Sequence, residues 1–204
     1  MYARTTYAVG DPAKIEDSLD RLRNEAPKLL ADSHGYRMFG LFADREMGKI
    51  AMASWWETEA DCRSSDEHLA DRRASLLTPF ADTITVETWE VGAFVPGEAE
   101  APKGSRFRIG QFDIDASRCD DLARLFQERG IPTMRDLPGF GGAAMLLDRS
   151  RGRGCVGTLY TDRSSFDASR ARQSESRRIA AERTGLRLQS LEEFDVVLTE
   201  RKPD

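Results

Sequence analysis

Histidine, cysteine and aromatic residues are scarce in this chain of 204 residues. Two histidines leave little material for a metal site, and no histidine and carboxylate cluster has the spacing of metal ligands. Cys62, Cys119 and Cys155 lack the Cys-x-x-Cys spacing of zinc or redox sites, so we expect three small buried residues. The sequence therefore predicts neither a metal nor a cofactor.

Long hydrophobic runs are also missing. No window approaches the roughly 18 apolar residues of a membrane span, and residues 1–7 carry neither the basic nor the apolar segment of a signal peptide. The composition of 40% hydrophobic and 32% charged residues is typical of a folded globular protein. We therefore expect a cytoplasmic protein that has no membrane partner.

The basic residues do not form a nucleic-acid-binding pattern. The net charge is −5, and the arginine-rich segment 163–187 is interleaved with Asp167, Glu175 and Glu182 and carries few aromatic residues. This pattern is typical of a solvated helix face. Together with the absence of an aromatic motif on the predicted sheet surface, it argues against RNA as a partner.

An internal repeat is the most informative feature that is present. A constant shift of 104 residues aligns six pairs: Asp32 with Asp136, Gly35 with Gly139, Asp44 with Asp148, Arg45 with Arg149, Gly48 with Gly152 and Arg73 with Arg177. After one inserted residue, a shift of 105 aligns Trp89 with Phe194. We predict a first repeat at 1–95, a Pro- and Gly-containing linker at 96–105 and a second repeat at 106–200.

Each repeat has the pattern strand, helix, strand, strand, helix, strand, which is that of a ferredoxin-like unit. In the first repeat, Asp11-Pro12 begins a helix whose apolar residues recur every three or four positions. The strand at 50–56 is apolar on both faces, so its second face must also be buried. We therefore predict an α+β fold in which two ferredoxin-like βαββαβ repeats pack sheet to sheet as an intramolecular dimeric α+β barrel. Whether this pseudo-dimer also forms a homodimer is left open.

The chain resembles the antibiotic biosynthesis monooxygenase-like branch of the dimeric α+β barrel superfamily, in tandem form. The resemblance rests on Gly35-Tyr36, on Pro138-Gly139-Phe140 and on the strand end Trp55-Trp56-Glu57-Thr58. It implies cofactor-independent oxidation of an aromatic or polyketide-like small molecule, in which the substrate itself supplies electrons to oxygen. Haem-degrading members instead carry an Asn on the first strand and a Trp and a His on the second helix, and that pattern is absent.

The resemblance also suggests acid–base residues. His68 lies near the place where oxygenase-like members carry a helix histidine, and a histidine in an apolar pocket acts as a general base toward a phenolic proton. His34, in the loop before the second strand, is a candidate for the edge of the pocket. An exposed position with no catalytic role is the alternative for each.

Aromatic side chains of the first repeat are the candidates for substrate contact. Trp55 and Trp56 are adjacent on a strand and must point to opposite faces, so at most one faces the barrel interior. Tyr7, Tyr36 and Trp89 are further candidates, and ordinary packing is the alternative for all five. The second repeat has no tryptophan and no histidine, so it is interpreted as scaffold.

Two functions are therefore open at the level of the sequence. One is a monooxygenase-like enzyme whose pocket lies in the first half. The other is a binding or sensing module of the same fold that captures an apolar small molecule without transforming it. A small-molecule ligand is common to both.

Overall fold

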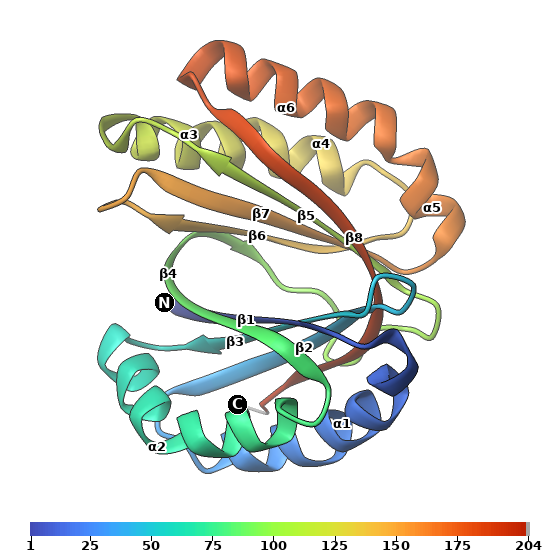
Figure 1. Ribbon diagram of the computed structural model, residues 1–204. Helices are drawn as coiled ribbons and strands as arrows, with labels where there is room; N and C mark the ends of the chain where they lie inside the picture. The colour runs from blue at the N-terminus through green and yellow to red at the C-terminus, as the bar shows by residue number, and fades with distance from the viewer. Residues whose placement is uncertain (203–204) are drawn as a thin grey trace. The chain divides into compact units, whose positions relative to one another are not determined.

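The computed structural model describes residues 1–202 (Figure 1). Its first half contains β1 (Tyr2–Gly10), α1 (Ile15–Ala31), β2 (Tyr36–Asp44), β3 (Lys49–Trp56), α2 (Glu59–Leu77) and β4 (Ala81–Val95). Its second half contains β5 (Arg106–Asp113), α3 (Cys119–Leu125), η3 (Phe126–Gly130), α4 (Ile131–Arg135), β6 (Phe140–Asp148), β7 (Arg153–Tyr160), α5 (Arg163–Ala168), α6 (Arg170–Thr184) and β8 (Arg187–Arg201). Short turns η1 (Pro12–Lys14) and η2 (Ala116–Arg118) precede α1 and α3.

The strands form a closed barrel in the hydrogen-bonded order β1-β3-β2-β8-β5-β7-β6-β4. The α+β class and the strand pattern of the tandem dimeric α+β barrel are thereby confirmed. Contacts within the chain define two compact units: unit 1 comprises Met1–Trp89 and the chain from Asp195 onward, and unit 2 comprises Glu90–Phe194. The repeat and linker boundaries at 95 and 105 stay predictions.

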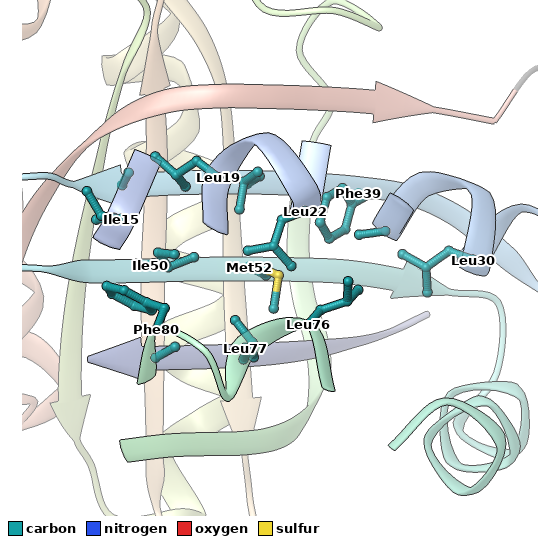
Figure 2. Packing of buried hydrophobic residues seen from close by; sticks show 14 of the residues in the cluster. Ile15, Leu19, Leu22, Leu30, Phe39, Ile50, Met52, Leu76, Leu77 and Phe80 are labelled. Atoms are coloured by element: carbon teal, nitrogen blue, oxygen red, sulfur yellow. The ribbon is translucent and has the colours of Figure 1, made fainter. Parts of the chain in front are cut away.

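Unit 1 is an antiparallel sheet with two helices on one face (Figure 1). β3 pairs with both β1 and β2, and the last part of β8 pairs with β2 from Asp195 to Arg201. The apolar stripe predicted for α1 is buried: Ile15, Leu19 and Leu22 lie against the strand residues Ile50 and Met52 (Figure 2). The helix periodicity thus identifies the side that packs on the sheet.

Unit 2 repeats this arrangement, with β7 between β5 and β6 and with residues 90–95 of β4 paired to β6. Its first helix is less regular than α1. A π-helical turn, η3, separates α3 from α4, and Pro132 lies in the first turn of α4. Helical structure therefore continues to Arg135, whereas Gly130 and Pro132 predict an end near Arg129, because the wider turn accommodates both residues.

The matched glycines of the repeat lie at equivalent turns. Gly35 and Gly139 have φ values of +70° and +65°, in the left-handed region. A Cβ atom at Gly35 would lie 2.4 Å from the Asp61 carboxyl carbon, and one at Gly139 would lie 2.5 Å from Ser165 Oγ. Both the backbone conformation and the close approach of the following helix require glycine.

No helix within residues 1–202 is long and apolar enough to cross a membrane. In the same part of the chain, no group of three or more His, Cys, Asp and Glu side chains is arranged to hold a metal ion.

Candidate small-molecule cavity

Unit 2 contains a cavity of about 740 Å³ between its sheet and its helices. We call it the large cavity. Its apolar lining comes from strands and helices alike: Phe112, Leu122, Leu125, Phe126, Met134, Met145, Val156, Ile179, Ala180, Leu186, Leu188 and Leu191. A volume of this size and an apolar wall are typical of sites for small organic molecules.

The corresponding space in unit 1 is a small cavity of about 60 Å³, and the repeat explains the difference. Leu76 and Met52 line the small cavity, and the 104-residue shift replaces them with Ala180 and Val156 in the large one. Thr6 is likewise replaced by Gly110. Shorter side chains at matched positions leave unfilled space because the surrounding backbone keeps its packing distance.

The large cavity opens to solvent beside β8. Leu188 and Leu191 line it and are 44% and 42% exposed. These leucines are among the most exposed large apolar side chains of residues 1–202. Exposed apolar groups at a cavity entrance favour entry of an apolar ligand.

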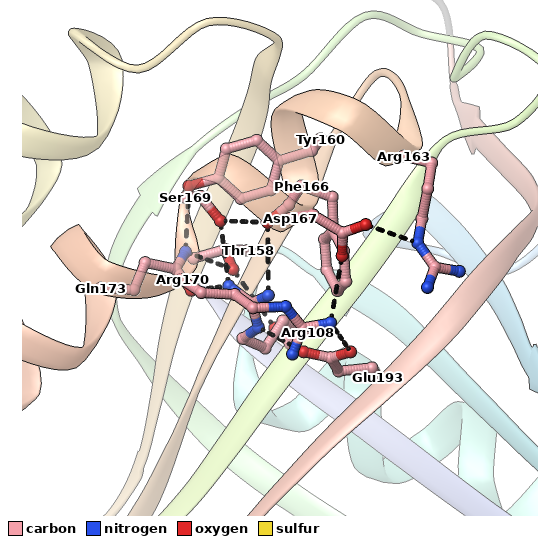
Figure 3. Close-up of polar contacts among 10 residues, drawn as sticks. All are labelled: Arg108, Thr158, Tyr160, Arg163, Phe166, Asp167, Ser169, Arg170, Gln173 and Glu193. Carbon is pink, nitrogen blue, oxygen red and sulfur yellow. Dashed lines mark hydrogen bonds and ion pairs between the residues drawn. The ribbon is translucent and has the colours of Figure 1, made fainter.

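One wall of the large cavity is polar and centres on Arg108 of β5, which is 2% exposed (Figure 3). Its Nε donates to Glu193 Oε1 at 3.0 Å, and its Nη1 donates to Gln173 Oε1 at 2.5 Å. Nη1 also donates to Ser169 Oγ at 3.0 Å, and the guanidinium lies 4.2 Å from the centre of the Phe166 ring. Arg108 thus connects β5 with α5, α6 and β8 through its side-chain contacts.

Gln173 extends this network to β7. Its Nε2 donates to Thr158 Oγ1 and to Tyr160 Oη, both at 3.0 Å (Figure 3). Burial raises the pKa of Tyr160, and its hydrogen bonds with Ser169 and Gln173 oppose this rise. Tyr160 therefore stays protonated at neutral pH and acts as a hydrogen-bonding group rather than as a base.

The equivalent of Arg108 in unit 1 is Arg4, which is 4% exposed. Arg4 donates to the Cys62 carbonyl at 2.6 Å and to Ser65 Oγ, as Arg108 does to Phe166 and Ser169. The repeat shift of 104 aligns these two arginines in the sequence. The sequence does not predict their burial, because an arginine in a strand is ordinarily exposed.

The structure separates the predicted aromatic candidates into two sets. Tyr36 and Trp56 belong to the core between sheet and helices of unit 1, with exposed fractions of 2% and 0% and ring centres 5.7 Å apart. Trp56 Nε1 donates to Ser54 Oγ at 3.1 Å. Neither side chain lines the large or the small cavity.

Tyr7, Trp55 and Trp89 share the opposite face of the unit 1 sheet. Tyr7 pairs with Ala51, which alternates with the core residues of β3, and Trp55 lies on that same face. Trp89 Nε1 donates to Thr5 Oγ1 at 2.8 Å, so Trp89 also belongs there. The structure places these three on one face of the sheet, and their contact with a substrate stays a prediction.

Both histidines are exposed and line neither cavity. His68 lies on α2, and its Nδ1 is 2.6 Å from the Ser64 carbonyl oxygen. His34 Nδ1 is 2.6 Å from Asp61 Oδ1, and this hydrogen bond raises the pKa of His34. Because α2 covers the core face of the sheet, the structure does not bring His68 together with Trp55.

Asp61 also stabilises the start of α2. It forms a capping box with Thr58: Thr58 Oγ1 accepts from the Asp61 backbone N–H at 3.1 Å, and the Asp61 carboxylate accepts from the Thr58 N–H at 3.2 Å. The hydrogen bonds from Thr58 and His34 lower the pKa of Asp61. His34 is therefore held by the helix start rather than directed toward a cavity.

The α+β barrel fold is shared with solved structures of other proteins. The match to a solved structure of a proposed monooxygenase from Fusobacterium nucleatum covers 98% of this chain and 94% of that protein, with a TM-score of 0.76 and 10% identity. The match to a solved structure of an anthrone oxidase-like protein covers 98% of this chain and 92% of that protein, with a TM-score of 0.68 and 13% identity. The resemblance predicted from the sequence is confirmed at the level of the fold.

Among curated sequences, the chain is similar to the uncharacterized protein Rv2557 of Mycobacterium tuberculosis. The two are 27% identical over 195 residues, which cover 96% of this chain and 84% of the relative. No family model matches the chain. The similarity to Rv2557 extends through both repeats.

Proposed function

We propose that this protein binds an apolar small molecule in the large cavity of unit 2. The observation that carries the proposal is the contrast between matched positions, since the same fold leaves a cavity of about 740 Å³ in unit 2 and one of about 60 Å³ in unit 1. Apolar side chains that line a space of this size lack packing partners, which costs stability through lost contacts. A bound ligand would restore those contacts.

The test uses N-phenyl-1-naphthylamine, a neutral probe whose fluorescence rises in apolar surroundings. We expect saturable binding of about one probe per chain. Ala180→Leu together with Val156→Met restores the side chains of unit 1 and occupies part of the large cavity. This double variant should weaken probe binding at least ~10-fold, because the probe and the new side chains compete for one volume.

Ser174→Leu is the matched control, since it adds a leucine at an exposed position of α6. It should leave the affinity for the probe unchanged. Melting temperatures of both variants report whether folding is retained. Wild-type affinity in the folded double variant, or no saturable binding to the wild type, would contradict the proposal.

A second candidate is cofactor-independent oxidation of an aromatic substrate, which the barrel fold shared with a proposed monooxygenase and an anthrone oxidase-like protein favours. In such a reaction a substrate methylene loses two hydrogen atoms and gains a carbonyl oxygen from O2. The other oxygen atom leaves as water, and the substrate supplies all four electrons. His68 is the candidate base, since Nδ1–H donation to Ser64 leaves Nε2 able to accept a proton.

Anthrone and a panel of polyphenols test this second candidate in an oxygen electrode. We expect oxygen consumption that depends on the protein and that falls at least ~10-fold in a His68→Ala, His34→Ala double variant. Arg63→Ala, an exposed change on α2, is the control. Saturable probe binding without oxygen consumption on any panel member would leave binding alone as the function.

A further inference from the structure

Arg177 of α6 lines the large cavity, and the acidic group that acts on it, Glu193, does so from beyond ion-pair distance. Within residues 1–202, it makes neither a hydrogen bond nor an ion pair, although it is half-buried. Burial and the neighbouring charge of Arg108 lower the pKa of Arg177. A guanidinium partly removed from water without a partner is costly, and an anion beside it would offset that cost.

The repeat shows how this arginine lost its partner. In unit 1 the equivalent Arg73 pairs with Asp66, whose Oδ1 lies 2.7 Å from Arg73 Nη2. The shift of 104 places Arg170 where Asp66 would be, and Arg170 points its guanidinium to Asp167 and Glu193. Unit 2 therefore keeps the arginine and removes the carboxylate.

No other carboxylate within residues 1–202 forms an ion pair with Arg177, since Glu193 attracts it only from a distance and is paired with Arg108 and Arg170. The lining of the large cavity contains four arginines and two glutamates: Arg108, Arg129, Arg177, Arg183, Glu128 and Glu182. Arg108 is held by Glu193, Ser169 and Gln173, and Glu182 accepts from Arg178. The lining is positive, and Arg177 is the lining arginine that adjoins the Arg108 network.

We propose that the ligand of the large cavity is an anionic amphiphile, with an apolar body among the leucine and phenylalanine side chains and a carboxylate or sulfonate group on Arg177. This inference rests on the proposed binding function. A planar guanidinium suits such a head group because two parallel N–H groups bond two oxygen atoms. The apolar wall supplies affinity, and the arginine selects the charge and the orientation.

Two probes that differ by one group test the inference. 8-Anilinonaphthalene-1-sulfonate is N-phenyl-1-naphthylamine with an added sulfonate, so their affinities compare an anionic with a neutral form of one ligand. We expect the sulfonate to bind about 10-fold more tightly. Arg177→Met should remove this preference and leave the neutral probe unaffected, whereas Arg177→Lys should retain part of it.

Arg73→Met is the matched control, because it removes the equivalent arginine in unit 1 and should not change the preference. Sodium sulfate at the probe concentration should not displace the sulfonate probe, since it lacks an apolar body. Dodecanoate should displace it at lower concentrations than dodecan-1-ol. Equal affinities for the two probes, or a preference unchanged in folded Arg177→Met, would overturn the inference. Failure of both probes to bind would instead contradict the binding function.

Discussion

Replacing Arg108 with methionine is expected to lower the free energy of unfolding by about 3 kcal/mol. Methionine keeps much of the apolar stem beside Phe166 and removes the guanidinium, which has partners in Glu193, Ser169 and Gln173. Oε1 of the buried Gln173 would then lose its donor. The loss is measured by urea denaturation followed by circular dichroism.

Arg170→Met is the matched control because it removes a second arginine from the same carboxylate. Arg170 Nη2 lies 2.7 Å from Glu193 Oε2, but its side chain is 51% exposed. An exposed pair of this kind contributes under about 1 kcal/mol. A loss no greater for Arg108→Met than for Arg170→Met would show that the buried network does not stabilise unit 2.

The network around Arg108 also explains how the large cavity coexists with a folded unit. Shorter side chains at Ala180 and Val156 remove contacts between α6 and the sheet. Arg108 supplies others, since one side chain connects β5 to Phe166, Ser169, Gln173 and Glu193. Hydrogen bonds from Arg108 at the start of α6 thus fix the helix to the sheet, although the side chains farther along the helix leave the large cavity beside it.

The fold could be predicted from the sequence because its signals are local and repeated. The spacing of Ile15, Leu19 and Leu22 identifies the buried side of α1, and Gly35 and Gly139 recur because both turns need positive φ. Apolar residues on both faces of β3 predict a sheet buried on both sides. Each inference depends on a few neighbouring residues or on one constant shift.

The large cavity could not be predicted in this way. Tryptophan and histidine occur only in the first half, and this difference between the repeats favours an interpretation of the second half as scaffold. The changes that create the cavity are Leu76 to Ala180, Met52 to Val156 and Thr6 to Gly110, each an ordinary difference between apolar or small residues. Only the structure shows that these positions surround one space.

Arg177 illustrates the same limit for charge. The sequence aligns it with Arg73 as a matched position of the framework. It does not show that the partner of Arg73 is Asp66. The two residues are well separated in the sequence of α2, but Asp66 Oδ1 lies 2.7 Å from Arg73 Nη2. The repeats share this arginine but differ at the carboxylate. The difference can be related to function only because the structure shows the ion pair between Arg73 and Asp66.

Replacing Trp56 with alanine is expected to lower the free energy of unfolding by about 4 kcal/mol, the largest effect of any single change proposed for unit 1. The indole is fully buried, packs 5.7 Å from the Tyr36 ring centre and lies under the Arg4 guanidinium at 5.2 Å. Truncation removes these contacts and leaves a void that β3 and α2 cannot close without breaking the sheet register.

Trp56→Phe is the control that separates packing from ligand contact. It keeps an aromatic ring against Tyr36 and loses the hydrogen bond to Ser54, so it should cost only about 1 kcal/mol. Urea denaturation measures both variants, and neutral-probe binding measures the large cavity in parallel. Since Trp56 lines neither cavity, the phenylalanine variant should bind the probe as the wild type does. Unchanged stability of Trp56→Ala combined with lost probe binding would instead make Trp56 a wall of the ligand site, as the sequence alone had suggested.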